Sequence, residues 1–158
     1  MNEKDSFGLV LFNDEPMIFQ NLESMSKLDI KDLKSRISLY IEAAGGTNMV
    51  NAYKSAVSML SEQSEQDIAM ENRIIFLTDE KAQSEQKMID PSTLLGMVNH
   101  NKDKIYSTMI GVGVDFDNDL IEKITNLRGA NYYAIHSEKE FVEILDHNFE
   151  LMINPLLF

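Results

Sequence analysis

Short, mostly apolar runs alternate along the chain with segments in which apolar residues recur every three or four positions. The runs are typical of strands that are buried on both faces. They span residues 7–12, 73–77, 105–112 and 131–135. The helical spacing occurs at residues 30–41, 48–60, 91–98, 120–127 and 141–149. Strands that alternate with helices predict an α/β fold with a doubly wound, mostly parallel sheet and helices on both faces.

Turn and cap residues add detail to this pattern. Pro16 precedes a short apolar run at residues 17–19, which predicts an edge strand antiparallel to the first run. The run at 73–77 is bounded by charge and is the clearest candidate for a central strand. Ser137 and Glu140 have the spacing of a capping box, so a helix is expected to begin there.

Two oxygen-bearing side chains are expected at one edge of the predicted sheet. Gly45 and Gly46 end one helix, and the next opens at Thr47 or Asn48. Asp79 follows the run at 73–77 almost directly. Ligands of parallel α/β sheets bind outside the carboxyl ends of the strands, and a hydroxyl with a carboxylate suits Mg²⁺ or Mn²⁺. The alternative is that Thr47 and Asp79 serve only as helix N-caps.

Charge narrows the range of partners. The 158 residues contain 14 basic and 26 acidic side chains, a net charge of -12. Such a surface repels nucleic acid and favours cations or basic protein surfaces, although acidity can also serve solubility alone. The chain has no cysteine, which excludes disulfides and thiolate metal sites. No signal-peptide layout and no apolar run near the ~18 residues of a membrane span is present, so direct membrane insertion is not expected.

Other candidate sites have weaker support. They are His100, His136 and His147 for zinc, Asp115, Asp117 and Asp119 for calcium, Ser55, Ser58 and Ser84 as nucleophiles, and Gly111 and Gly113 for a dinucleotide. The histidines lack ligand spacing, and the aspartates lack the glycine and distal glutamate of a calcium loop. The serines and glycines lack the remainder of their motifs. No catalytic residue is therefore predicted.

Five stretches in order resemble the von Willebrand factor type A domain, a Rossmann-like fold. They are residues 5–12, the sequence Gly45-Gly46-Thr47-Asn48, the sequence Phe76-Leu77-Thr78-Asp79, residues 110–120 and residues 128–133. The resemblance covers essentially the whole chain and implies a single domain over residues 1–155. Residues 156–158 would then begin a following segment. The tail at 149–156 is similar to that of bacterial members labelled as chloride-channel-like proteins or cell-surface adhesins, which implies a parent protein that is secreted or at the cell envelope.

The resemblance implies a non-enzymatic interaction or adhesion module. In the family, a metal-ion-dependent adhesion site holds Mg²⁺ or Mn²⁺ at the carboxyl edge of the sheet. Thr47 would supply the hydroxyl ligand of the second motif, and Asp79 the carboxylate of the third. A partner protein completes the shell with an acidic side chain.

The chain departs from the family at two points. The first motif, Asp-x-Ser-x-Ser, is absent from this sequence, so the family's central first strand is expected to be missing and the domain N-terminally truncated. Glu80 stands where the family has glycine. The strand edges left unpaired predict a gap or a rearranged pairing, and a homodimer through those edges. The alternatives are a structural scaffold with a degenerate, metal-free site and, less favoured, a small α/β phosphatase or nucleotide-binding protein.

Overall fold

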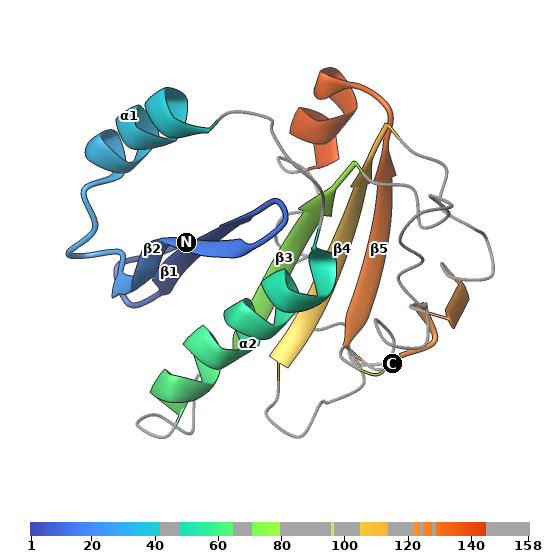
Figure 1. The fold of residues 1–158 in the computed structure, drawn as a ribbon, viewed down its shortest axis with the longest axis horizontal. Coiled ribbons are helices and arrows are strands. Elements are labelled where there is room, and N and C mark those ends of the chain that lie inside the picture. The colour runs from blue at the N-terminus through green and yellow to red at the C-terminus, as the bar shows by residue number, and fades with distance from the viewer. Residues whose placement is uncertain are drawn as a thin grey trace. The chain divides into compact units, whose positions relative to one another are not determined.

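The structure is a computed structural model that describes residues 1–41, 48–64, 71–79, 96, 105–113, 122–123, 125–127 and 129–144. The chain divides into two compact units, Met1–Gln63 and Ser64–Phe158. Each unit contains a sheet of its own (Figure 1). Thr47, Glu80, His100 and His147 lie outside the described residues, as do residues 114–120 and 145–158.

The first unit is built on an antiparallel hairpin of β1 (Ser6–Phe12) and β2 (Pro16–Ser24). Phe12 pairs with Pro16 at the turn, and Ser6 pairs with Ser24 at the open end. The antiparallel pairing predicted for residues 17–19 is confirmed. The strand is longer than predicted, because residues 20–24 are polar apart from Leu22 but continue the ladder along the full length of β1.

Helix α1 (Ile30–Tyr40) is attached to β2 by an arginine. The helix begins after Asp29, whose Oδ1 accepts hydrogen bonds from the backbone N–H groups of Lys31 and Asp32, both at 3.0 Å. Arg36 Nη2 donates to Gln20 Oε1 at 2.8 Å, and its guanidinium carbon lies 5.4 Å from the centre of the Phe19 ring. Together with the buried Leu33, these contacts hold α1 against the hairpin.

Helix α2 (Met49–Ser64) is joined to the turn of the hairpin by Asn48, the residue before its first turn. The backbone N–H of Asn48 donates to the Asn13 carbonyl at 2.7 Å, and its side-chain amide donates to the Asp14 carbonyl at 3.2 Å. Asn48 Oδ1 accepts from the Asn51 N–H at 3.2 Å and so caps the helix. The predicted start of this helix is confirmed. The helix continues to Ser64, beyond residue 60, where the helical spacing of apolar residues ends.

The close approach of α2 to β1 depends on Gly8. A Cβ atom at this position would lie 2.5 Å from Met59 Sδ, a distance that real Cβ atoms do not adopt. The absence of a side chain at Gly8 therefore lets the thioether of Met59 pack directly on the strand.

The second unit is built on a parallel sheet with the strand order β3 (Asn72–Thr78), β4 (Ile105–Val112) and β5 (Ala130–Ile135) (Figure 1). All three predicted strands are confirmed. The prediction that 73–77 is a central strand is wrong for this sheet, because β4 is in the middle and β3 is at an edge. Within the described ranges, β1 and β3 belong to separate sheets.

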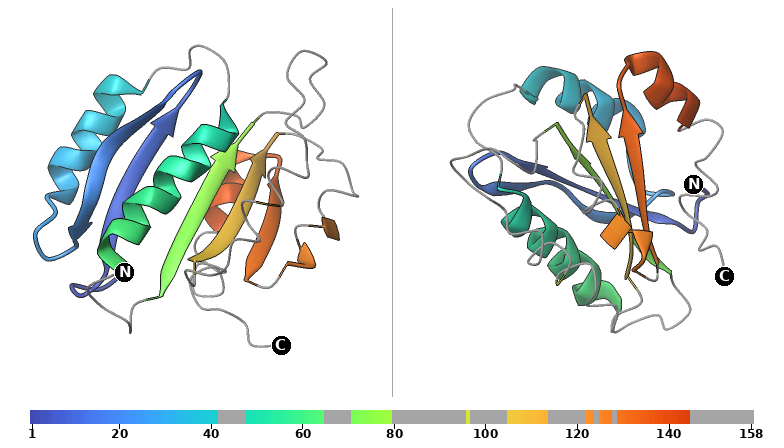
Figure 2. Two further views of the ribbon diagram at one scale, coloured as in Figure 1. Left: turned by 60° about the horizontal axis from the view of Figure 1, so that its bottom comes forward. Right: turned by 90° about the vertical axis from the view of Figure 1, so that its right-hand side faces the viewer.

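A helix over residues 138–144 packs on one face of the parallel sheet (Figure 2). Its Phe141 and Ile144 contact a buried cluster of Ile110 and Ile135. The predicted cap is present, since Ser137 Oγ accepts from the Glu140 N–H at 3.2 Å. The Glu140 carboxylate returns to the N–H of His136, at 2.7 Å, one residue earlier than the standard capping box requires.

We predict that Gly8→Ala destabilises the protein through Met59. The new methyl group displaces the Met59 thioether from β1, and because the methionine side chain is flexible the cost lies at the lower end of the range for overpacking, about 1 kcal/mol. Urea denaturation of a double-mutant cycle measures the coupling: in a Met59→Ala background, Gly8→Ala becomes neutral or stabilising. Gly96→Ala is the control for adding a methyl group without a steric clash, because a Cβ atom at Gly96 would have no heavy atom within 4 Å. Its effect is stabilising, by about 0.5–1 kcal/mol, because Gly96 is helical and alanine has the higher helix propensity. Equal effects of Gly8→Ala in both backgrounds would contradict the contact.

Candidate functional site

The carboxyl ends of the three parallel strands are level with one another. Thr78 at the end of β3 pairs with Gly111, and Gly111 pairs with Ala134 near the end of β5. The N–H of Gly113, which has φ 67°, donates to the Ile135 carbonyl at 2.6 Å and closes the edge beyond β4. The register therefore brings residues that follow each strand to one side of the sheet.

Asp79 is the first residue beyond β3 on this edge. Its side chain is exposed, whereas that of the preceding Thr78 is buried. Within the described part of the chain, the Asp79 carboxylate makes no hydrogen bond or ion pair. An exposed carboxylate of this kind is a suitable ligand for a hard cation. The expectation that Asp79 stands at the carboxyl edge of the sheet agrees with the strand bounds.

Thr47, the second predicted ligand, lies outside the described residues. Glu80, which follows Asp79, is also outside them. Among the residues that the structure describes, no group of three or more His, Cys, Asp or Glu side chains is close enough to hold a metal ion. Asp79 fits the chemistry of a Mg²⁺ or Mn²⁺ ligand, and it is one ligand of the several that such an ion requires.

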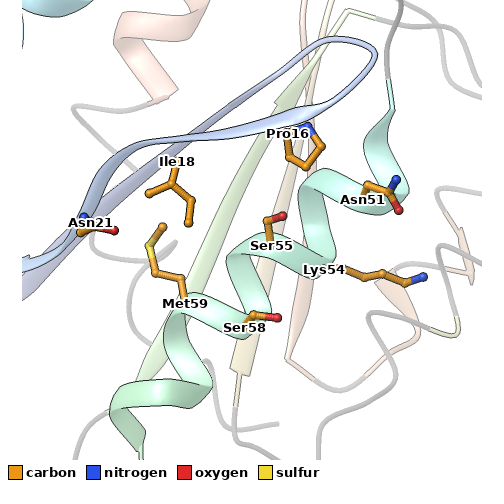
Figure 3. Close-up of a pocket in the computed structure, with 8 residues that line it drawn as sticks. All are labelled: Pro16, Ile18, Asn21, Asn51, Lys54, Ser55, Ser58 and Met59. Carbon is orange, nitrogen blue, oxygen red and sulfur yellow. The ribbon is translucent and has the colours of Figure 1, made fainter.

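Two of the candidate serines line a hollow of about 360 Å³ in the first unit (Figure 3). Its lining residues are Pro16, Ile18, Asn21, Asn51, Lys54, Ser55, Ser58 and Met59. Figure 3 shows that β2 supplies one wall and α2 the other. No histidine or carboxylate belongs to this lining, so Ser55 and Ser58 have no general base beside them in the hollow.

The remaining candidates are only partly covered by the structure. His136 is exposed just beyond β5, and its backbone rather than its ring makes the bond to Glu140. Gly111 is a buried residue within β4, and Gly113 follows the strand at a positive φ. The three aspartates considered for calcium lie outside the described residues.

A basic site at the opposite end of β3 was not anticipated from the sequence. Arg73 Nη1 donates to Thr108 Oγ1 at 3.1 Å, and its guanidinium carbon lies 5.3 Å from the centre of the Tyr106 ring. Arg73 Nε is buried and has no hydrogen-bond acceptor. Burial lowers the pKa of the Arg73 guanidinium, whereas Glu71, Tyr106 and Tyr133 act in the opposite direction. The guanidinium nevertheless remains protonated at physiological pH.

The sequence does contain a signal for this site. Arg73 is the only charged residue within β3, and it shares a strand face with Ile75 and Leu77 because alternate residues point to the same side. A buried donor without an acceptor costs about 1–3 kcal/mol. The other residues on this face of β3 are apolar, so a charged residue among them is unexpected. Its presence indicates that Arg73 has a local partner or a functional role.

The fold has clear relatives among solved structures. The chain superposes on a von Willebrand factor type A protein from Catenulispora acidiphila with a TM-score of 0.68 and 18% identity, over 97% of this chain and 34% of that chain. It superposes on the conserved hypothetical protein BatB from Bacteroides thetaiotaomicron with a TM-score of 0.65 and 12% identity, over 96% and 80% of the two chains. An aerotolerance-related membrane protein from Bacteroides fragilis gives 0.60 at 16% identity, over 98% and 82%. These likenesses confirm the α/β fold class.

Sequence comparison gives the family. The chain is 27% identical over 165 residues to inter-alpha-trypsin inhibitor heavy chain H2 of Mesocricetus auratus; the match covers 99% of this chain but 17% of that protein. The model of the von Willebrand factor type A domain matches residues 1–147. This match spans both sheets, α1, α2 and the edge that carries Asp79. The chain therefore belongs to the von Willebrand factor type A domain family.

Proposed function

We propose that this chain is a non-enzymatic protein–protein interaction module that binds its partner at the carboxyl edge of β3, β4 and β5. Domains of this family commonly mediate protein–protein interactions. The observation that carries the proposal is the exposed Asp79 carboxylate, which follows β3 at the level where the three strands end. A carboxylate in this position is available to a ligand from outside the chain.

The proposed ligand of Asp79 is Mg²⁺ or Mn²⁺, with Thr47 as the second protein ligand. The ion would supply a positive charge with exchangeable positions, to which an acidic side chain of the partner binds. Electrostatics supports this role, because the net charge of -12 repels an acidic partner unless a cation reverses the sign locally. Asp79 would hold the ion directly or through a water molecule, and Thr47 would contribute its hydroxyl oxygen.

The second candidate is a structural scaffold with a metal-free site. Two observations favour it: the sequence contains no Asp-x-Ser-x-Ser motif, and the described residues contain no cluster of three metal-ligating side chains. A scaffold of this kind would bind its partner with no dependence on divalent cations.

A homodimer through unpaired strand edges is a further proposal. β1 and β3 each pair on one side in the described sheets, and both are apolar strands of seven residues. Neither contains the proline or lysine with which natural proteins block strand edges, and the single charge of β3, Arg73, stands at its amino end. A second copy of the chain is thus a suitable partner for these edges.

The proposed location of the parent protein is the cell envelope or the exterior. The membrane protein from Bacteroides fragilis, which has the same fold, supports this proposal. In the described part of this chain, no helix is long and apolar enough to cross a membrane. The chain spans 17% of the curated relative that it matches, so the activity of that whole protein concerns a much longer chain.

We predict that Mn²⁺ binds the chain and that Asp79→Ala weakens this binding by about tenfold or more, because a charged ligand is lost. Thr47→Ala should weaken it as well. Isothermal titration of the metal alone into each protein provides the measurement. Glu71→Ala is the matched control, since it removes an exposed carboxylate from the opposite end of β3 and should leave the affinity unchanged. Equal affinities for wild type and Asp79→Ala would reject the metal site and favour the scaffold.

We also predict that the chain dimerises reversibly. Sedimentation velocity over a range of concentrations should show a dimer that dissociates on dilution. Leu77→Lys should shift the protein toward monomer, because a charged side chain on an edge strand opposes pairing. Met17→Lys, at an exposed position of β2, is the control and should leave the dimer intact. A monomer at every concentration would contradict dimerisation through these edges.

A further inference from the structure

Met59 is a contact through which helix α2 packs on the hairpin of the first unit. Its Sδ atom lies so close to Gly8 of β1 that a Cβ atom on this glycine would be only 2.5 Å away. Figure 3 shows the Met59 side chain extending from α2 toward β2, with Ile18 on the opposite wall. A thioether fills such an irregular space well because it is flexible, polarizable and apolar. The packing of α2 on the hairpin therefore depends in part on the chemical state of one sulfur atom.

The Met59 side chain is also accessible to small solutes. It is partly exposed, and it lines the hollow of about 360 Å³ between β2 and α2. All residues that line this hollow belong to the described part of the first unit. A water molecule takes up about 30 Å³ in the liquid. Hydrogen peroxide is only slightly larger than water, so a hollow of this size admits it to the side chain.

Met59 differs from methionines that are either sealed or freely accessible. Met49, the first residue of the same helix, is 1% exposed, and Met109 of β4 is 3% exposed, so burial protects both sulfur atoms. Met17 of β2 is 52% exposed, so its oxidation removes little packing. Met25, which is partly exposed, follows the end of β2 and does not line the hollow. Met59 combines access from the hollow with a close contact to the neighbouring strand.

We propose that Met59 is a redox-sensitive modification site, at which hydrogen peroxide converts the thioether to a sulfoxide and thereby loosens α2 from β1. A lone pair of the sulfur attacks one peroxide oxygen, an S–O bond forms and the O–O bond breaks. The departing hydroxide takes the proton of the transferred OH group and leaves as water. The sulfur is oxidised by two electrons, and the peroxide is reduced by two. The product is methionine sulfoxide, which methionine sulfoxide reductases convert back to the thioether.

A sulfoxide does not fit the contact between Met59 and β1, because it is polar and carries an additional oxygen atom. On the β1 side this oxygen has no space, since the sulfur already lies too close to Gly8 to admit a Cβ atom. On the side of the hollow, the oxygen can accept a hydrogen bond from the hydroxyl of Ser55, one helical turn earlier on the same face, which would draw the sulfur away from β1. Both arrangements separate the side chain from the strand. No step requires a metal ion or a partner, so this inference is independent of the proposed function.

Treatment of the full chain with hydrogen peroxide in EDTA tests the proposal. Peptide mass spectrometry over time should find Met17 oxidised first, Met59 next, and Met49 and Met109 last. Once Met59 is oxidised, the Tm of the wild-type protein should be about 2–4 °C lower than before treatment. In Met59→Leu, a substitution of similar volume, the same treatment should leave the Tm unchanged. Met17→Leu is the matched control and should lose stability on oxidation as the wild type does.

A readout on the wild-type protein needs no variant to fold. Hydrogen exchange of the α2 amides should become faster after oxidation, whereas exchange of the β4 amides in the second unit should stay as before. Oxidation of Met59 no faster than that of Met49 or Met109 would overturn the proposal, because the reaction would then proceed through global unfolding. A sulfoxide at Met59 with an unchanged Tm would overturn it as well. So would a Met59→Leu protein that peroxide destabilises as much as it does the wild type, since another methionine would then be responsible.

Discussion

The parallel register of β3, β4 and β5 is the constraint on which the functional features of the second unit depend. A parallel ladder sends every strand in the same direction, so all carboxyl ends lie at one edge and all amino ends at the other. Because Thr78 is level with Gly111, and Gly111 with Ala134, Asp79 is placed at the edge where ligands bind in folds of this class. The same register places Arg73 beside Tyr106 at the other end, where it reaches Thr108. Two sites of opposite charge therefore stand at opposite ends of one strand.

Apolar periodicity predicted the strands well because their composition follows directly from burial. The runs at 73–77, 105–112 and 131–135 became β3, β4 and β5 within a residue or so at each end. The order of the strands could not be obtained in this way, since consecutive apolar residues indicate burial but not which neighbours cover them. The run at 73–77 is as apolar as a central strand, yet it forms the edge of its sheet. The polar half of β2 was missed because its pairing to β1, rather than its side chains, holds it in the sheet.

The candidate site was predicted in part. Asp79 was placed at the carboxyl edge of β3 from the rule that ligands bind outside strand ends, and the strand bounds agree. Its pairing with Thr47 stays a prediction, because Thr47 lies outside the described residues. Arg73 was not singled out, since a charge at the start of a strand is ordinary in sequence. Only the contact to Thr108, the stacking on Tyr106 and the buried Nε distinguish it. The strand's apolar period marks the position of Arg73, but it does not show which groups the guanidinium contacts.

The features of β3 are together consistent with an interaction module. β3 is the end strand of the described parallel sheet, and it carries a cation at one end and precedes a carboxylate at the other. The most direct test of this account is residue-resolved hydrogen exchange of β3 and β4 in the isolated chain. In a parallel strand, alternate residues direct their backbone groups to opposite neighbours. The account predicts that β4 amides are protected throughout, whereas protected and rapidly exchanging amides alternate along β3. Uniform protection along β3 would show that its edge is already occupied and would contradict the account.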